Sequence, residues 1–568
     1  MCTPLLHVIL VMLALSIACG PTQAGGNPPA SAGGAAIPTA TRSLTIITKG
    51  EPAYIAPLNV AGSPFGSHAT DALFAVGLVV DDQLNAPHPQ LAEALPALNT
   101  DTWQLFPDGT METTYHLRPN LTWQDGAPLS ADDFVFALAV HHDPTAGAQI
   151  WDPSAALLTN EISSVAAPDD RTLVIQWTKP DYLAGELVGT GKSFGPLPRH
   201  ILERPFREDP GRLLEHPYWT TQFVGASPYK LVRWEPGAFI ETSAFDGYAL
   251  GRPRIDRVKL IWNADANAAL ATVLGGNADL AADDALRFEQ GALLKQRWAA
   301  GEGQVLFNIT QLRYAQLQFR PEYANPKAMG DARFRQALAF ATDKQGFVDN
   351  LLGGQGIVAD TMASRDRDYY PALDQVIAKY PFDPRRTEQL LTQVGYSRGA
   401  DGAYVAGDGQ PLDIEIRGEQ ENETIILADS WKRAGIGNHV AVLTTQQASD
   451  NEYRSTMPAL TVTKNMVEDS TVAKKFTTAL VASPDNRWGG TNRGGYSNPA
   501  YDRLSELYYA ALDHAERNRI VVALVKIQTE DLPGLPLYYD LSATAHISAL
   551  QGPLGNIFWN VDQWEWRG

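Results

Sequence analysis

The sequence predicts a mixed α/β protein built from two to four domains or from two large lobes. The chain has 568 residues, of which 44% are hydrophobic and 19% are charged, and this length supports more than one apolar core. Segments with the period of a strand alternate with segments with the period of a helix, and no fixed repeat occurs. This order is typical of α/β architectures.

Short runs rich in β-branched or alternating apolar residues predict the strands. The run SLTIIT at 43–48 ends at Lys49-Gly50, and ETTYHL at 112–117 alternates like a half-buried strand, which are strand signals. The predicted strands are residues 43–48, 112–117, 172–177, 229–234, 258–262 and 412–416.

Capping residues and apolar spacing predict the helices. Ser130 precedes the acidic pair Asp132-Asp133 and then an apolar run, which is an N-cap with carboxylates at the positive end of the helix dipole. Residues 331–350 carry apolar side chains at helical spacing, with Gly346 as a weak point in the middle. The other predicted helices are residues 267–274, 387–394, 501–509 and 515–530.

Charge and cysteine content exclude several classes of function. The formal net charge is −19, which disfavours nucleic acid as a partner because the chain repels phosphate backbones. Both cysteines, Cys2 and Cys19, lie within the first twenty residues. The folded body therefore has no internal disulfide and no thiolate metal site.

The N-terminus is predicted to be a targeting segment. Residues 5–18 form an apolar run that is short for a bilayer crossing and suitable for a signal peptide. The run ends in Ser16-Ile17-Ala18-Cys19, which resembles the lipobox of bacterial lipoproteins, in which the cysteine is lipidated. Ser16 stands where Leu is usual, and no Lys or Arg precedes the run. The alternative is an ordinary cleaved signal.

Residues 20–41 have the composition of a flexible tether. The segment holds five Gly, four Pro and six Ala, and the first charged residue of the chain is Arg42. Such a composition cannot build a core. We therefore predict an extracytoplasmic body, lipid-anchored to the membrane through Cys19.

Enzymatic signatures are absent at the level of motifs. The sequence has no H-E-x-x-H, G-x-S-x-G or EF-hand pattern. The pair His141-His142 is interpreted as exposed or capping, since adjacent side chains point to different sides of an element. The sequence therefore predicts neither catalysis, nor a metal, nor a cofactor.

Aromatic residues in polar or glycine-rich segments are candidate ligand contacts. These are Trp151, Tyr314, Trp488 and Tyr496. Residues 487–496, RWGGTNRGGY, combine four glycines with two arginines that can hold a carboxylate by bidentate hydrogen bonds. The alternatives are a core role for each aromatic ring and a solvated surface loop for 487–496.

Several segments together resemble the bacterial extracellular solute-binding proteins of family 5, the peptide- and nickel-binding components of ABC importers. They occur in the family's order across residues 43 to about 540. The matching segments are LAE at 91–93, YHLR at 115–118, LTWQDG at 121–126, LSADDFVF at 129–136, GASPYKLVRWEPG at 225–237, FRQALAFATD at 334–343, YPFDP at 380–384 and GYSNPAYD at 495–502.

The resemblance implies an α/β, two-lobed periplasmic-binding-protein-like fold (type II, cluster C) with an extra subdomain inserted in lobe one. The chain is expected to cross to lobe two near 305–312 and to return near 533–539, so that two crossings make a hinge. The expected divisions are 1–19 signal peptide, 20–41 tether, 42–304 first part of lobe one with the inserted subdomain at about 63–205, 305–535 lobe two, and 536–568 return to lobe one.

The resemblance also implies ligand contacts. The loop after the first strand places Gly62 and Ser63 near the ligand, and Tyr314 and the loop from Trp488 to Arg493, including Asn492, are further candidates. Peptide-binding members carry a Gly-Trp-Asp cluster before the G-Y-S-N-P segment. Residues 460–483 contain no Trp, although Asp469 lies at a suitable sequence distance from Tyr496.

The predicted function is a membrane-tethered, monomeric receptor that delivers a peptide or peptide-like solute to ABC permease subunits. The same scaffold binding an oligosaccharide, a metal chelate or another small solute is an alternative, as is a ligand sensor. An extracytoplasmic hydrolase is a remote alternative.

Overall fold

The computed structural model describes residues 42–55, 69–83, 86–147, 161–185, 195–555 and 558–567, and Arg42–Gly568 form one unit. The predictions about the signal peptide, Cys19 and the tether lie outside these residues. No helix in the described ranges is long and apolar enough to cross a membrane.

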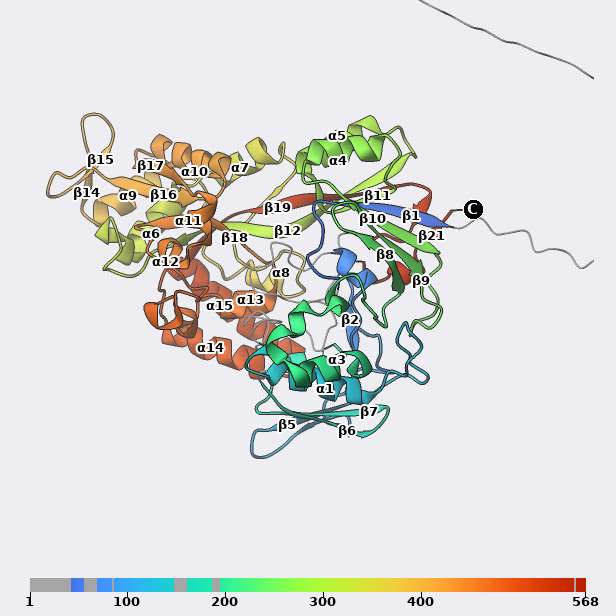
Figure 1. The fold of residues 1–568 in the computed structure, drawn as a ribbon. Coiled ribbons are helices and arrows are strands. Elements are labelled where there is room, and N and C mark those ends of the chain that lie inside the picture. Colours follow the sequence, from blue (N-terminus) through green and yellow to red (C-terminus); the bar gives the residue numbers. More distant parts are fainter. Residues whose placement is uncertain are drawn as a thin grey trace, which may run out of the picture. The chain divides into compact units, whose positions relative to one another are not determined.

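One mixed, eleven-stranded sheet runs through the unit (Figure 1). Parallel pairs such as β1 with β10 and antiparallel pairs such as β12 with β19 share it. Its strands in spatial order are β17 (Gly437–Val442), β16 (Asp413–Gly418), β18 (Leu460–Asn465), β12 (Gly303–Leu317), β19 (Gly534–Ile547), β11 (Leu280–Arg287), β1 (Ser43–Thr48), β10 (Arg257–Trp262), β9 (Phe239–Ala244) and β8 (Tyr229–Glu235), with β13 (Ile357–Val358) beside β19.

The long strands β12 and β19 connect the two ends of this sheet. They pair antiparallel from Gly303 opposite Ile547 to Gln316 opposite Gly534, with register shifts at Ile309/Gln311 and Arg313/Tyr314. β12 also pairs with β18 and β19 with β11. In Figure 1 both strands extend from the region of β11 to that of β18.

The alternation of side chains on β12 sends its residues into two cores. Ala315 and Leu317 pack in a core with Phe334, Leu427 and Trp431, whereas Leu312 and Tyr314 pack in another with residues of the C-terminal helices. The helices are α4 (Ala266–Leu274), α5 (Phe288–Arg297), α6 (Ala332–Phe340), α7 (Lys344–Leu351), α8 (Tyr370–Leu373), α9 (Pro384–Gln393), α10 (Glu421–Arg433), α11 (Thr445–Ser449), α12 (Asn451–Ser455), α13 (Asp469–Lys474), α14 (Pro499–Ala510) and α15 (His514–Asp531).

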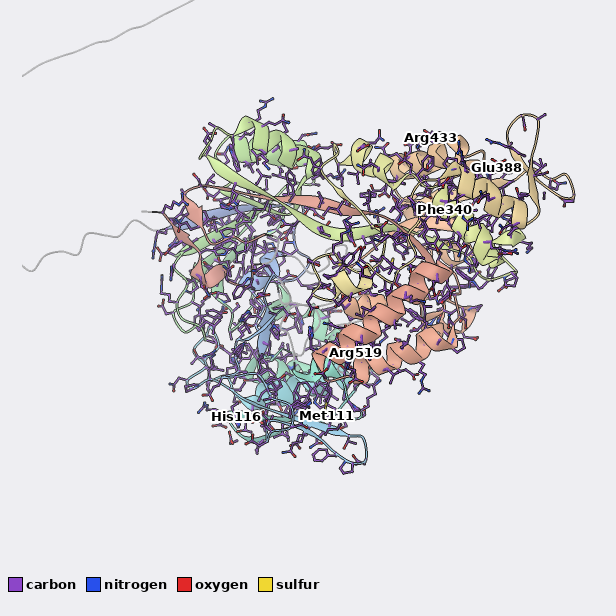
Figure 2. All side chains as sticks on the ribbon, turned by 180° about the vertical axis from the view of Figure 1, so that it is seen from behind. Met111, His116, Phe340, Glu388, Arg433 and Arg519 are labelled. Carbon is purple, nitrogen blue, oxygen red and sulfur yellow. The ribbon has the colours of Figure 1, made fainter. Side chains whose placement is uncertain are left out.

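A smaller sheet packs with two helices of the first half. Its strand order is β4 (Trp103–Leu105), β5 (Met111–His116), β7 (Thr172–Trp177) and β6 (Ile162–Asp169). The helices are α1 (Ala131–His142) and α3 (Arg199–Glu208). Figure 2 labels Met111 and His116, the two ends of β5, as well as Arg433 at the end of α10. Two-stranded ribbons complete the described strands: β2 (Val79–Asp81) with β3 (Pro87–Pro89), β14 (Tyr396–Arg398) with β15 (Tyr404–Ala406), and β20 (Leu550–Gln551) with β21 (Glu565–Trp566).

Local signals predicted most of these elements well. The strands 43–48 and 172–177 are confirmed as β1 and β7, and Ser130 forms a capping box with Asp133 at the start of α1. The single helix predicted for 331–350 is wrong, because the segment forms α6 and α7. Asp343 caps the second helix by accepting a hydrogen bond from Gly346 N, so the chain breaks before Gly346.

Candidate functional site

The Tyr314 hydroxyl is a buried polar group that the protein leaves unused. Tyr314 lies on β12 opposite Thr463 of β18 and is 0% exposed. Its ring meets that of Phe476 edge to face. Burial raises the pKa of the phenol, and the hydroxyl has no hydrogen-bond partner among the described residues. Such a group normally finds a partner.

Lys475 lies beside this tyrosine, directly after α13. It is 9% exposed, and its Nζ is 5.7 Å from the centroid of the Tyr314 ring. Burial, followed by the nearby charges of Arg493 and Arg454, lowers the pKa of the Lys475 ammonium to about 7. Buried lysines are usually paired with a carboxylate, whereas the charged neighbours of Lys475 among the described residues are cations.

Two arginines complete the group. The Nε atoms of Arg493 and Arg454 are both buried without a hydrogen-bond partner among the described residues. Burial and then the charge of Arg454 lower the pKa of Arg493 to about 10. Arg454 has one ion pair, 3.5 Å from Glu419. We call Tyr314, Arg454, Lys475 and Arg493 the basic cluster.

Asn492 positions the loop that carries Arg493. Its Nδ2 donates to the carbonyls of Phe476, Thr477 and Tyr496, at 3.2, 3.1 and 2.8 Å, and its Oδ1 accepts from Tyr496 N at 3.1 Å. The side-chain amide is therefore fully used by the backbone in this conformation. The loop is held against the residues that follow α13, which brings Arg493 and Lys475 together.

The glycines of this loop serve its packing. A Cβ atom at Gly494 would lie only 1.9 Å from the carbonyl oxygen of Leu317 on β12. The close approach that the sequence suggested for a ligand is thus made, at this glycine, with the protein's own backbone.

Three other side chains that the sequence predicted as ligand contacts interact with residues outside the basic cluster. The Tyr496 hydroxyl donates to Asp531 Oδ2 at 2.5 Å. The ring of Trp488 lies edge to face with Tyr323. Asp469 accepts from the Tyr369 hydroxyl at 2.6 Å and lies 3.4 Å from Arg367. Of the predicted side chains, the structure therefore brings together Tyr314 and Arg493.

Comparison with known proteins decides the family. Residues 87–487 match the family described as Bacterial extracellular solute-binding proteins, family 5 Middle. The chain belongs to family 5 of the bacterial extracellular solute-binding proteins.

Two curated relatives show how far this family 5 protein resembles named members. It is 25% identical over 380 residues to a probable ABC transporter-binding protein of Deinococcus radiodurans, covering 61% of this chain and 62% of the relative. It is 23% identical over 438 residues to the oligopeptide-binding protein AppA of Bacillus subtilis, covering 76% of this chain and 74% of AppA. The chain thus spans less than two thirds of the length of the Deinococcus relative.

Solved structures show the fold. NikA of Brucella suis, solved with Fe(III)-EDTA, aligns with a TM-score of 0.73 at 16% identity over 92% of this chain and all of NikA. AppA, solved with a nonapeptide, aligns with a TM-score of 0.69 at 19% identity over 93% of this chain and all of AppA. The family 5 protein therefore has the predicted two-lobed α/β fold of periplasmic binding proteins.

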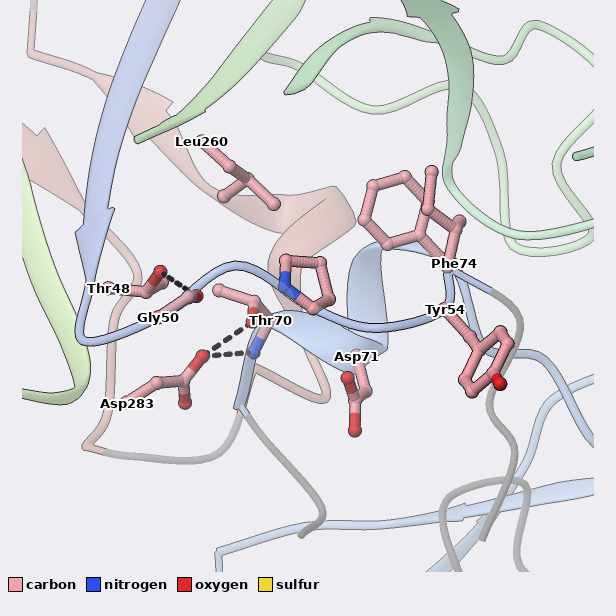
Figure 3. A pocket seen from close by; sticks show the side chains of 10 residues that line it. Thr48, Gly50, Tyr54, Thr70, Asp71, Phe74, Leu260 and Asp283 are labelled. Atoms are coloured by element: carbon pink, nitrogen blue, oxygen red, sulfur yellow. Dashed lines mark hydrogen bonds between the residues drawn. The ribbon is translucent and has the colours of Figure 1, made fainter. Parts of the chain in front are cut away.

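A hollow at the end of β1 is too small for a solute. Gly62, Ser63 and Trp151 lie outside the described residues, but Figure 3 shows the segments that flank 56–68. Asp283 accepts hydrogen bonds from the backbone amides of Ala69 and Thr70. The hollow beside them, lined by residues such as Tyr54 and Phe74, holds about 20 Å³, which is the room of about one water molecule. A larger depression of about 480 Å³, lined by residues such as Glu51, Thr221 and Trp234, lies at the surface nearby.

Sequence reasoning missed Lys475 and Arg454 in this family 5 protein. Lys474 and Lys475 are adjacent in the sequence, and nothing local distinguishes them. In the structure, Lys475 faces Arg493 and Arg454, whereas the charged neighbours of Lys474 include Glu161 and Asp181. Only the fold reveals which of the two lysines has no acidic neighbour in the described part of the chain.

Proposed function

We propose that this protein is the extracytoplasmic receptor of an ABC importer, which captures a peptide or peptide-like solute between its lobes and delivers it to the permease without catalysis. The family match over residues 87–487 carries the proposal. AppA is named an oligopeptide-binding protein and was solved with a nonapeptide, which supports peptides as the first solutes to test.

The course of the long strands supports capture by hinge closure. β12 and β19 connect the two ends of the main sheet, and the segments 305–312 and 533–539, where we expect the crossings, fall on these strands or directly next to them. In this proposal, 42–304 and 536–568 form lobe one and 305–535 form lobe two. Closure is favoured when one ligand contacts both lobes.

The remaining parts of the proposal concern the receptor's surroundings. A lipid on Cys19 anchors the protein, the tether at 20–41 gives it reach above the membrane, and the folded unit acts as a monomer. Because the lobes have cores of their own, no second copy is required to complete either lobe.

Native mass spectrometry of the purified full-length protein, followed by denaturation, tests the proposal. A heterogeneous set of released peptides supports an oligopeptide receptor, whereas a released sugar or metal chelate replaces the solute class. Permease-dependent uptake of the released compound supports the importer role. Binding without such uptake overturns that role in favour of a sensor, and turnover of the bound compound overturns the assignment as a non-enzyme.

A further inference from the structure

The basic cluster differs from the other buried cations of this protein. Arg313 donates to both carboxylate oxygens of Glu423. Lys344, which is 8% exposed, donates to the Ala359 carbonyl at 2.8 Å and lies 3.4 Å from Asp360. Lys475 and Arg493 have no ion pair or side-chain hydrogen bond among the described residues. An uncompensated buried charge is strongly destabilising, so Lys475 and Arg493 require a counter-charge that the described residues do not supply.

Two neutral hydrogen-bond donors in or beside the basic cluster also lack acceptors among the described residues. Within the described part of the chain, neither the buried Tyr314 hydroxyl nor the Nδ2 of Asn465, which is 7% exposed, has a hydrogen-bond partner. Asn465 lies two residues from Thr463 on β18, and Thr463 is opposite Tyr314. Because alternate residues of a strand share a face, Asn465 and Tyr314 project from the same side of the sheet. The basic cluster and Asn465 therefore place cationic and neutral hydrogen-bond donors close together, with fewer acceptors than donors among the described residues.

The charge balance specifies the missing partner. With Lys475 protonated, Arg454, Lys475 and Arg493 supply three positive charges, and Glu419, which pairs with Arg454, supplies one negative charge. Among the described residues, two positive charges are left without a counter-charge. A group with two negative charges and several acceptor oxygens satisfies both the charge and the free donors.

We propose that the basic cluster is a subsite for a doubly charged oxyanion group carried by the solute, either a phosphate or phosphonate or a pair of carboxylates. The inference rests on the proposed receptor function, since it specifies the class of solute. It adds Lys475 and Arg454 to the sequence-predicted contacts Tyr314 and Arg493.

The position of the subsite agrees with a ligand that contacts both the chain before β12 and the chain after it. Lys474, the neighbour of Lys475, lies near Glu161 and Asp181 of the segment before β12. Tyr182 of the same segment lies against Tyr508 of α14, with the two hydroxyl oxygens 3.2 Å apart. The basic cluster therefore lies beside the contact between the segment before β12 and the helices α13 and α14. The remainder of a bound solute can extend from the cluster towards this contact.

Calorimetric titration of the full-length protein at low ionic strength and pH 7.5, where phosphate and phosphonate are largely dianionic, tests the proposal, with inorganic phosphate, phenylphosphonate, malonate and acetate as probes. We expect at least one dianionic probe to bind more tightly than acetate. Binding of phosphate and phenylphosphonate alone identifies a phosphorus oxyanion, and binding of malonate alone identifies paired carboxylates. Equal binding of acetate, or no binding of any dianionic probe, overturns the proposal.

Matched variants separate the subsite from general surface charge. Lys475→Met and Arg493→Met should each weaken dianion binding by about tenfold or more. Lys464→Met, at an exposed position on β18, and Arg503→Met, at an exposed position on α14, should leave it unchanged. Equal losses in all four variants overturn the subsite.

Two further readouts keep the test decisive. If circular dichroism shows that Lys475→Met or Arg493→Met does not fold, an NMR measurement on the wild-type protein replaces that variant. The protein should broaden the ³¹P signal of phosphate or phosphonate, or the ¹H signal of malonate. Excess of the same anion should reverse this broadening, and chloride should not. Absence of that reversal counts against the subsite. A released solute that lacks a dianionic group but is imported overturns the subsite alone, whereas dianion binding without permease-dependent uptake overturns the receptor role alone.

Discussion

Arg313, near the C-terminal end of β12, and Glu423 of α10 form a buried ion pair. Arg313 Nε donates to Glu423 Oε1 at 2.7 Å, and the two side chains are 2% and 1% exposed. The Tyr538 hydroxyl of β19 donates to the same carboxylate. One carboxylate at the start of α10 therefore holds both strands that connect the ends of the sheet.

Removing the charge of Glu423 should destabilise the fold strongly. We expect Glu423→Gln to lower the free energy of unfolding by about 3–5 kcal/mol, because it leaves the Arg313 guanidinium buried without its counter-charge. Urea denaturation followed by circular dichroism measures the loss. The exposed pair Arg204–Glu208 is the control, and Glu208→Gln should change stability by less than about 1 kcal/mol. Similar values for both variants would contradict the assigned role of the pair.

Removing Lys475 should stabilise the ligand-free protein. Arg454, Arg493 and Tyr314 are the titratable groups around it, Glu419 pairs with Arg454, and the pKa of Lys475 is lowered from 10.5 to about 7. Between these values the unfolded chain binds more protons, so this lysine makes wild-type stability rise with pH, and its full penalty remains below pH 7.

Thermal unfolding in phosphate-free buffers from pH 6 to 9 checks this prediction. Lys475→Met should melt higher than the wild type at pH 6, with a difference that shrinks as pH rises. Lys464→Met controls for the loss of an exposed lysine. A difference that does not depend on pH would show that Lys475 is not the group responsible.

Asp181 should give the opposite pH dependence. Burial and a hydrogen bond with the Glu161 carboxyl raise the pKa of Asp181 well above its ordinary value of 3.8. The folded state then retains a proton that the unfolded chain loses. The resulting stability is fully present below the ordinary value and is lost as pH rises through the folded pKa.

Asp181→Asn keeps a neutral polar group at this position and should reduce the loss of melting temperature towards alkaline pH. Asp170→Asn, at an exposed position of the same region, is the control. Identical pH profiles for the wild type and Asp181→Asn would refute the assignment.

Tyr182 should hold the chain before β12 against the C-terminal helices α14 and α15. It belongs to the turn η3 (Tyr182–Gly185), its ring lies edge to face with Tyr508, and the Arg517 guanidinium is 4.2 Å from its centroid. Such a cation–π contact contributes about 0.5–2 kcal/mol. We expect Tyr182→Ala to shift the ligand-free protein towards open forms.

Electron–electron distance measurements between spin labels on α3 and α9 check this shift. The distance distribution should move to longer values in Tyr182→Ala and stay unchanged in Tyr323→Ala, which removes a tyrosine that packs against Trp488. An unchanged distance distribution in both variants would mean that Tyr182 does not hold the chain before β12 against α14 and α15.

Local signals predicted the elements that local interactions decide. The β-branched run 43–48 became β1, and the Ser130–Asp133 capping box became the start of α1. The break between α6 and α7 escaped prediction, because it depends partly on Ser430, a distant residue whose hydroxyl donates to the Ala341 carbonyl and accepts from Asp343 N.

The candidate site was predictable only in part for the same reason. Tyr314 and Arg493 were singled out as an aromatic ring and an arginine in unusual surroundings, and the fold brings them together. Asn492 instead holds the backbone of its own loop. Lys475 and Arg454 gave no signal, since an exposed and a buried lysine are identical as sequence.

The sequence by itself determined the mixed α/β composition, the cysteine-free body and the family, because these depend on residue types and on spacings within short segments. The tertiary structure alone decided that β12 pairs with β19, more than two hundred residues away, and that Lys475 meets two arginines instead of a carboxylate. Burial and charge balance are set by side chains that only folding brings into contact, and the proposed subsite depends on both.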